Sequence, residues 1–187
     1  MEKLAKYVLT TLALLALGLS PAYSQITSNI ATINSASTDG SASSSVFQLS
    51  IAAAAATALT TTMKMNIMLS LAPQPSHQGI KADVYTVIVA GGRFFTLDPD
   101  GGYSPWNGAV ETLTPFVTGH TLSSTNEFTL LDGTLSEAGS YLYFAAYGVE
   151  GETRLLFTPN PAQLAVKEST ALPDEANMSG VFYSRDK

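Results

Sequence analysis

The chain has 187 residues and a formal net charge of −6, and its length suits about one domain. The excess of acidic side chains argues against binding to nucleic acid and to anionic membrane surfaces, because both attract basic proteins. The sequence contains no cysteine, which excludes disulfides, thiol catalysis and cysteine-bound zinc or iron–sulfur centres.

The first 24 residues have the features of a secretory signal peptide. Two lysines lie near the start, an apolar run of 12 residues follows at 8–19, and small residues occupy the two positions that a signal peptidase reads. The run is too short to span a bilayer comfortably. We therefore predict export to the periplasm or the extracellular space, with a mature chain that begins at Gln25 and has no membrane span. An uncleaved membrane anchor is the alternative.

Residues 25–45 predict a flexible leader, because they are rich in Ser, Thr, Ala and Asn and hold few large apolar side chains. A single domain is expected over 46–168, with a first strand at 46–51. In the alanine-rich residues 52–58, alanine favours helix but the neighbouring threonines do not, so we expect a short helical turn or a linker there. The polar residues 169–187 predict a C-terminal tail.

The middle of the chain predicts three strands joined by recognisable turns. Residues 63–71 alternate between apolar and more polar side chains, which is the period of a half-buried strand. Residues 82–90 are β-branched and apolar on both faces, as in a strand at the centre of a sheet. Gly91 and Gly92 predict a two-residue hairpin turn, and residues 93–97 then form the returning strand.

Residues 103–126 are harder to assign, and we expect a long loop with a short edge strand at 110–114. Long loops in compact domains often carry function. Regular strand patterns return after this loop, and prolines interrupt the last of them. The later strands are expected at 127–131, 140–149, 153–158 and 163–167.

Strands separated by turns, with no convincing amphipathic helix, predict an all-β fold, namely an antiparallel β-sandwich. One local motif points to the immunoglobulin-like type. Residues 137–141 read acidic-x-Gly-x-Tyr, the spacing of a tyrosine corner, in which a tyrosine hydroxyl bonds back to the backbone. We expect Tyr141 and Gly139 to be structural, with the phenol bonded near Leu135. A chance turn followed by a tyrosine is the alternative.

Four short motifs fall within these predicted strands and turns: ADVY at 82–85, GGRFF at 91–95, SPW at 104–106 and GSYLY at 139–143. On these motifs, the chain over about residues 63–166 resembles uncharacterised bacterial exported β-sandwich (immunoglobulin-like) domain proteins. The resemblance implies a domain that occurs alone or appended to larger exported proteins. It implies no activity and no catalytic residues, because the shared motifs are structural.

The signals for a metal site are weak. Asp98 and Asp100 resemble the start of a calcium loop, since oxygen ligands at alternating positions suit calcium, but the later acidic positions are missing and a plain turn is the alternative. His77 and His120 lie in polar, turn-like sequence without the spacing of a zinc site. We therefore expect exposed loop histidines and no cofactor.

The long loop holds the ligand-binding candidates Tyr103, Trp106 and Phe116. Exposed aromatic rings on a β-sandwich can stack on sugars, because the face of a ring is apolar and rigid. The alternative is that Trp106 closes one end of the core.

No catalytic constellation stands out, since the sequence has neither a G-x-S-x-G nucleophile motif nor a phosphate-binding glycine loop. We therefore predict a non-enzymatic module that acts by surface binding or assembly at the bacterial cell envelope, in an adhesive, structural or accessory role. Its partner would be another protein or a second copy of the chain. The alternative is a carbohydrate-binding module that uses the Tyr103 and Trp106 loop to hold a glycan.

Overall fold

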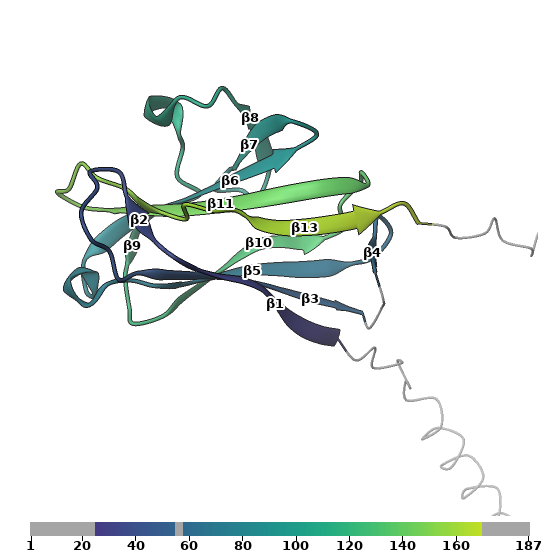
Figure 1. The fold of residues 1–187 in the computed structure, drawn as a ribbon, viewed down its shortest axis with the longest axis horizontal. Coiled ribbons are helices and arrows are strands. Elements are labelled where there is room, and N and C mark those ends of the chain that lie inside the picture. Colours follow the sequence, from purple (N-terminus) through teal and green to yellow (C-terminus); the bar gives the residue numbers. More distant parts are fainter. Residues whose placement is uncertain (1–24, 55–57, 170–187) are drawn as a thin grey trace, which may run out of the picture.

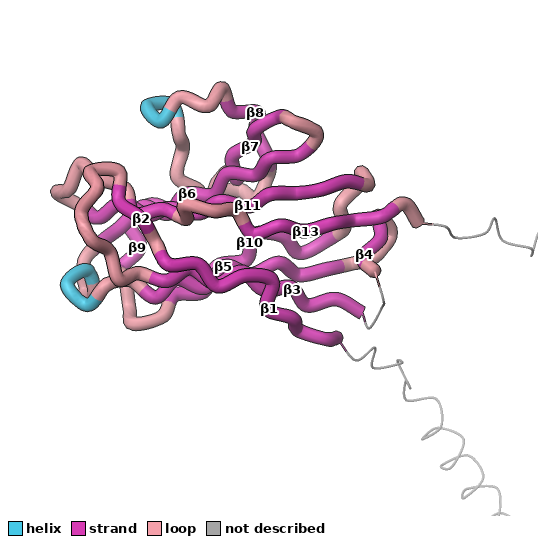
Figure 2. Tube along the Cα trace, viewed as in Figure 1, coloured by secondary structure: helices cyan, strands magenta, loops and turns pink. Residues whose placement is uncertain are grey.

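The computed structural model describes residues 25–54 and 58–169. The predicted signal peptide at 1–24 and the predicted tail beyond Ser169 lie outside the described residues. Strands and loops make up nearly all of the described part, and its only helical elements are two single turns of 3-10 helix (Figure 2). No helix among these residues is long and apolar enough to cross a membrane.

The described residues form thirteen strands, many of them short. In chain order they are β1 (Gln25–Asn34), β2 (Ala36–Ser37), β3 (Val46–Ala54), β4 (Leu59–Thr60), β5 (Met65–Ala72), β6 (Lys81–Ala90), β7 (Arg93–Leu97), β8 (Tyr103–Trp106), β9 (Val117–Thr121), β10 (Asn126–Gly133), β11 (Gly139–Val149), β12 (Leu156–Phe157) and β13 (Ala162–Lys167). The 3-10 turns are η1 (Pro75–His77) and η2 (Val110–Thr112).

The strands form two sheets that lie one above the other (Figure 1). The small sheet has the order β1-β3-β5-β10, and all its neighbours are antiparallel. The large sheet has the order β2-β12-β11-β6-β7-β8, with β13 beside β11 and β9 beside β6. The short strand β4 pairs in parallel with β13. The all-β class with antiparallel sheets is therefore as the sequence predicts.

The core fills the space between the two sheets, because strands on both sides alternate with period two. In β5 every second side chain is buried, from Met65 to Leu71. The facing strand β11 buries Tyr141, Tyr143 and Tyr147 on its inner side. The alternation in β5 agrees with the period that the sequence predicts for residues 63–71.

Two turns also follow the sequence closely. The strand β7 has the predicted bounds, and Gly91 and Gly92 connect it to β6 with φ angles of 56° and 74°. Such left-handed angles at both central positions favour glycine, which has no Cβ to clash with the backbone.

The N-terminal segment differs from the flexible leader that we expected at 25–45. Residues 25–34 form β1, which pairs along nearly the whole of β3 at the edge of the small sheet. Ile30 and Ile33 are partly buried against the core. A few apolar side chains are sufficient here, because β3 supplies backbone hydrogen-bond partners along the strand. The domain therefore begins before residue 46.

Three further expectations need correction. Ala52 to Ala54 extend β3 instead of forming a helical turn or a linker, and the small side chain of Ala53 is buried opposite Met65. Residues 55–57 of this segment lie outside the described residues. The expected loop at 103–126 contains strands β8 and β9, while 110–112 is a 3-10 turn and not an edge strand. Pro105 is tolerated in β8 because this strand lies at the edge of its sheet. The strand expected at 153–158 is reduced to β12.

Candidate functional site

The outer face of the large sheet is apolar at its centre. The outward side chains of β6 include Tyr85 and Val87, and those of β11 include Phe144 and Ala146. An antiparallel sheet that faces water on one side usually carries polar side chains there. This face therefore has a feature that the core alone does not explain.

The segment after β7 forms a wall above this face. Trp106 ends β8, and its indole Nε1 donates hydrogen bonds to the backbone oxygen of Ala109 and the hydroxyl of Thr112, both at 3.1 Å. The ring of Phe94 meets the indole edge-on, with the centroids 6.0 Å apart and an interplanar angle of 89°. The η2 turn is thus held at a fixed place over the sheet.

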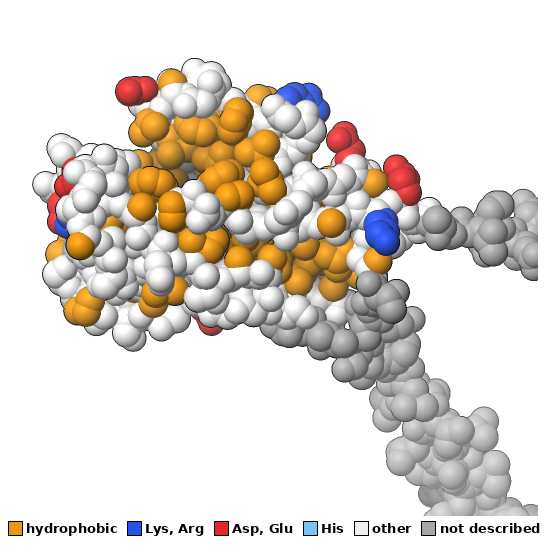
Figure 3. Space-filling view, in the orientation of Figure 1, with side chains coloured by type: hydrophobic (Ala, Val, Ile, Leu, Met, Phe, Trp, Pro, Cys, Tyr) orange, Lys and Arg blue, Asp and Glu red, His pale blue; other side chains and the backbone are white. Residues whose placement is uncertain are grey.

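A groove with a volume of about 330 Å³ lies between this wall and the sheet. Figure 3 shows it as a hollow of hydrophobic side chains below the η2 segment and above β11. We call it the outer groove, and its main lining residues are Tyr85, Phe94, Trp106, Val110, Phe144 and Phe157.

The outer groove is suited to apolar contact. None of the described residues that line it carries a charge. Phe94 and Val110 are 44% and 56% exposed, which makes them two of the most exposed large hydrophobic side chains of the described part. Contiguous exposed apolar surface of this kind marks interaction sites in soluble domains. The arrangement can bind an apolar group, and its only polar side chains other than the indole of Trp106 are the hydroxyl-bearing Thr38, Tyr85 and Thr158.

Of the three predicted ligand-binding residues, the structure places only Trp106 in the outer groove. Tyr103 points inward, and its hydroxyl donates to the backbone oxygen of Leu130 at 2.8 Å. Burial raises the pKa of Tyr103 to about 12. Phe116 is buried and meets Phe128 edge-on at 5.8 Å. Tyr103 and Phe116 therefore pack between the sheets, and neither of them lines the outer groove.

Trp106 does not close the end of the core either, since it lies on the outward side of the large sheet beside Phe94. Three further groove residues, Phe94, Phe144 and Phe157, were not among the candidates predicted from the sequence. The signal that could have found them is the apolar outward face of residues 82–90, which indicates a covered or a binding face.

The predicted calcium residues form a turn. Asp98 accepts a hydrogen bond from the Ser104 hydroxyl at 2.6 Å, and Asp100 accepts one from the backbone N–H of Gly102 at 3.2 Å. The backbone N–H of Gly101 donates to the Asp98 carbonyl at 2.9 Å and closes the turn. Within the described residues, no group of three acidic, histidine or cysteine side chains is placed to hold a metal ion.

The expectation of two exposed histidines is wrong for His77, which is 3% exposed. Its Nδ1 lies 3.0 Å from the hydroxyl of Tyr147, and this hydroxyl lies 2.6 Å from the hydroxyl of Ser45. Its Nε2 lies 2.6 Å from the Gln74 amide nitrogen and 3.4 Å from a carboxylate oxygen of Glu152. Burial lowers the pKa of His77, while Glu152 opposes that shift.

His120 is also only partly exposed. Its Nε2 lies 3.0 Å from the Asn126 side-chain oxygen, and its ring meets Phe128 edge-on at 5.2 Å. Asn126 in turn donates to the backbone oxygens of Leu71 and Ser123. His120 therefore helps to fix the start of β10.

The tyrosine motif has the hydrogen bond that its spacing predicts. The buried Tyr141 donates its hydroxyl hydrogen to the backbone oxygen of Glu137 at 2.6 Å, two residues beyond the expected Leu135. Gly139 lies between them with φ of 158°, a value that other residues rarely adopt. Both residues shape the turn between β10 and β11.

Comparison of the chain with protein-family models, with curated proteins and with solved structures finds no match.

Proposed function

We propose that the chain is an exported, non-enzymatic β-sandwich module that binds a protein partner at the bacterial cell envelope through its outer groove. The single observation that carries the proposal is an uncharged, partly exposed groove on the face of a sheet that could have been polar. The partner is a second copy of the chain or another envelope protein, in an adhesive, structural or accessory role.

The finer assignment of the fold, an immunoglobulin-like sandwich, is part of this proposal. Its support is the order in which strands pair. The neighbours β3-β5-β10 correspond to A-B-E of such a domain, and β13-β11-β6-β7 correspond to G-F-C-C′. Tyr141 then lies near the start of the strand that corresponds to F, where a tyrosine corner belongs.

The non-enzymatic assignment rests on where the reactive groups lie. Ser45, His77 and Tyr147 form a hydrogen-bonded series that resembles part of a catalytic relay. Their exposed fractions are 0%, 3% and 0%, and their side-chain polar atoms already bond one another, so none is free to meet a reacting molecule. They are better explained as a buried network that satisfies its own polar groups.

An apolar protein segment fits the outer groove better than a glycan does. Aromatic rings suit both ligands, but a sugar also needs several hydrogen-bonding groups around its hydroxyls. The polar lining groups of the groove are few, namely Thr38, Tyr85 and Thr158. The carbohydrate-binding alternative retains one favourable observation, the exposed aromatic pair of Phe94 and Trp106.

Site-specific photo-crosslinking in the producing cell tests the proposal. A photoreactive phenylalanine analogue at position 94 places the probe at the groove, and the same analogue in place of the exposed Lys64, which directly precedes β5 of the small sheet, serves as the control. We expect protein adducts of discrete mass from position 94 only. Equal adduct patterns from both positions, or none from position 94, would reject the groove as the binding surface.

Two further measurements test the carbohydrate-binding alternative and the cleavage of the signal peptide. A glycan array with the purified chain decides the carbohydrate alternative, which requires binding that is lost in Trp106→Ala. Mass analysis of the exported protein decides the processing, since we expect a mature N-terminus at Gln25. Recovery of the intact chain from the membrane fraction would contradict export by a cleaved signal.

A further inference from the structure

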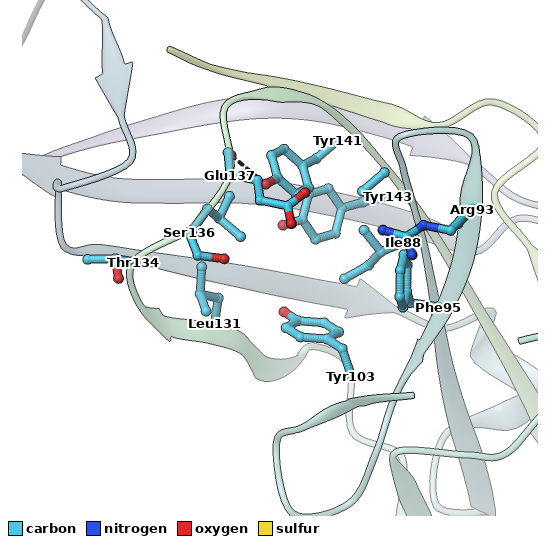
Figure 4. A pocket seen from close by; sticks show the side chains of 12 residues that line it. Ile88, Arg93, Phe95, Tyr103, Leu131, Thr134, Ser136, Glu137, Tyr141 and Tyr143 are labelled. Carbon is cyan, nitrogen blue, oxygen red and sulfur yellow. Dashed lines mark hydrogen bonds between the residues drawn. The ribbon is translucent and has the colours of Figure 1, made fainter. Parts of the chain in front are cut away.

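A second cavity lies between the two sheets, at the end where the β6–β7 hairpin faces the β10–β11 turn. Its volume is about 330 Å³. Ile88, Phe95 and Leu131 form apolar walls, and the exposed side chains of Arg93 and Glu137 stand at its mouth. We call it the tyrosine pocket, because Tyr103, Tyr141 and Tyr143 also line it (Figure 4).

The hydroxyls of two of these tyrosines are bound to the backbone. Tyr103 donates to Leu130 and Tyr141 donates to Glu137. The third, Tyr143, is 3% exposed, and its hydroxyl has no hydrogen-bond partner among the described residues. In Figure 4 the Tyr143 ring extends from β11 into the space that the labelled residues surround.

An unpartnered phenol is not needed for packing. A phenylalanine would fill the same space without a buried polar group, and such a group costs free energy when it has no partner. Tyr147, on the same face of the same strand, shows the usual solution, because its hydroxyl meets both Ser45 and His77. Burial and the neighbouring Tyr103 and Tyr141 raise the pKa of Tyr143, so its hydroxyl keeps its proton and can donate it.

We propose that the tyrosine pocket binds a small, uncharged, largely apolar molecule that carries one hydrogen-bonding oxygen, which meets the Tyr143 hydroxyl. The size follows from the volume, since a cavity of about 150 Å³ holds benzene and 330 Å³ therefore admits a bicyclic molecule. The neutral charge follows from the mouth, where Arg93 and Glu137 carry opposite signs and favour neither an anion nor a cation. This site is separate from the outer groove and does not depend on the function proposed for it.

The test uses 2-naphthol and its oxygen-free analogue 2-methylnaphthalene with the purified mature chain. We expect 2-naphthol to bind and to shift the methyl NMR signals of Ile88 and Leu131, without shifts at Val110 in the outer groove. In Tyr143→Phe, 2-naphthol should bind about three- to ten-fold more weakly, the loss of one hydrogen bond, while 2-methylnaphthalene binds as before. Ala90→Trp should abolish both by filling the pocket, and Phe94→Ser in the outer groove should change neither.

Three results would overturn the proposal. They are the absence of 2-naphthol binding to the parent up to its solubility limit, equal affinity of 2-naphthol for the parent and for Tyr143→Phe, and methyl shifts confined to the outer groove. Thermal unfolding of each variant shows that it is folded, and the shape-conserving Tyr143→Phe is the one on which the comparison rests.

Discussion

At the centre of the large sheet the inner and outer faces are both apolar, but they are covered very differently. Inward side chains such as Tyr143 and Tyr147 are 3% and 0% exposed, because the small sheet packs over them. The outward side chains have no second sheet over them among the described residues, and Phe94 remains 44% exposed. Apolar character on the inner face is explained by folding alone. On the outer face it needs a second reason, and binding is the reason that we propose.

The outer face of the small sheet provides the reference. Its outward residues include Gln48, Ser50, Asn66 and Ser70. All four are polar and are exposed or partly exposed to solvent. A sheet of this fold can therefore carry a polar outer face without losing its strands. The apolar outer face of the large sheet is a property of that surface and not a requirement of the architecture.

The largest expected effect comes from the inner face. Tyr147 is fully buried and packs against Phe47 with the ring centroids 6.1 Å apart. Its hydroxyl connects the Ser45 hydroxyl with the His77 ring in one hydrogen-bonded network. Tyr147→Ala should lower the free energy of unfolding by about 3–5 kcal/mol, because it leaves a cavity and unpaired polar groups. Chemical denaturation measures this, and a loss below about 1 kcal/mol would contradict the packing described.

A smaller effect on the same face separates paired from unpaired hydroxyls. Tyr141→Phe removes the hydrogen bond to the Glu137 carbonyl and should cost about 1–3 kcal/mol. Tyr143→Phe is the matched control, because it removes a hydroxyl without a partner among the described residues and should cost nothing or stabilise the protein. Equal losses in the two variants, measured by denaturation, would mean that the Tyr141 bond has no special structural value.

These inner-face features can be predicted from the sequence to different degrees. The alternation in 63–71, the Gly91-Gly92 turn and the tyrosine bond depend on residues within a few positions of each other, so local patterns predict them. The burial of His77 escapes such patterns, because its neighbours in the chain are polar. It is produced by Tyr147 and Glu152, which lie at least 70 residues away.

The candidate site can be predicted only in part. Trp106 is identifiable as an aromatic residue in an irregular segment, but Phe94, Phe144 and Phe157 come from three different strands. Their meeting depends on which strands pair and on which face each side chain takes, and single-sequence patterns do not determine strand order. The strand β1 escapes prediction for a related reason, since it is stabilised by its long pairing with β3 and not by its own composition.

The next effect is the dependence of stability on pH that we expect from His77, the hydrogen-bond partner of Tyr147. Burial lowers the pKa of His77 below its ordinary value of 6.5, with Glu152 opposing and Arg154 reinforcing the shift. The unfolded chain then binds a proton at a higher pH than the folded chain does. Stability should therefore fall as the pH decreases from above 6.5 toward the pKa of the folded state.

Denaturation at a series of pH values should show this fall in the parent and in His120→Gln. His77→Gln should lose the part of the fall that lies just below pH 6.5, and an unchanged profile would assign it to other groups.

The smallest effect on stability, and the clearest test of the two faces, is expected at the rim of the outer groove. Val110 is 56% exposed in η2, and Ile80 is a similarly exposed hydrophobic residue, at 37%, that lies outside the groove. Val110→Ser and Ile80→Ser should each change the free energy of unfolding by less than about 0.5 kcal/mol, because neither side chain is in the core. Only Val110→Ser should weaken the crosslinks formed from position 94, since only Val110 lies where the partner would bind.

If both variants leave the crosslinks unchanged, the apolar rim contributes nothing to recognition. If Val110→Ser destabilises the domain by several kcal/mol instead, the outer face is a second core, and its apolar character is explained by folding after all.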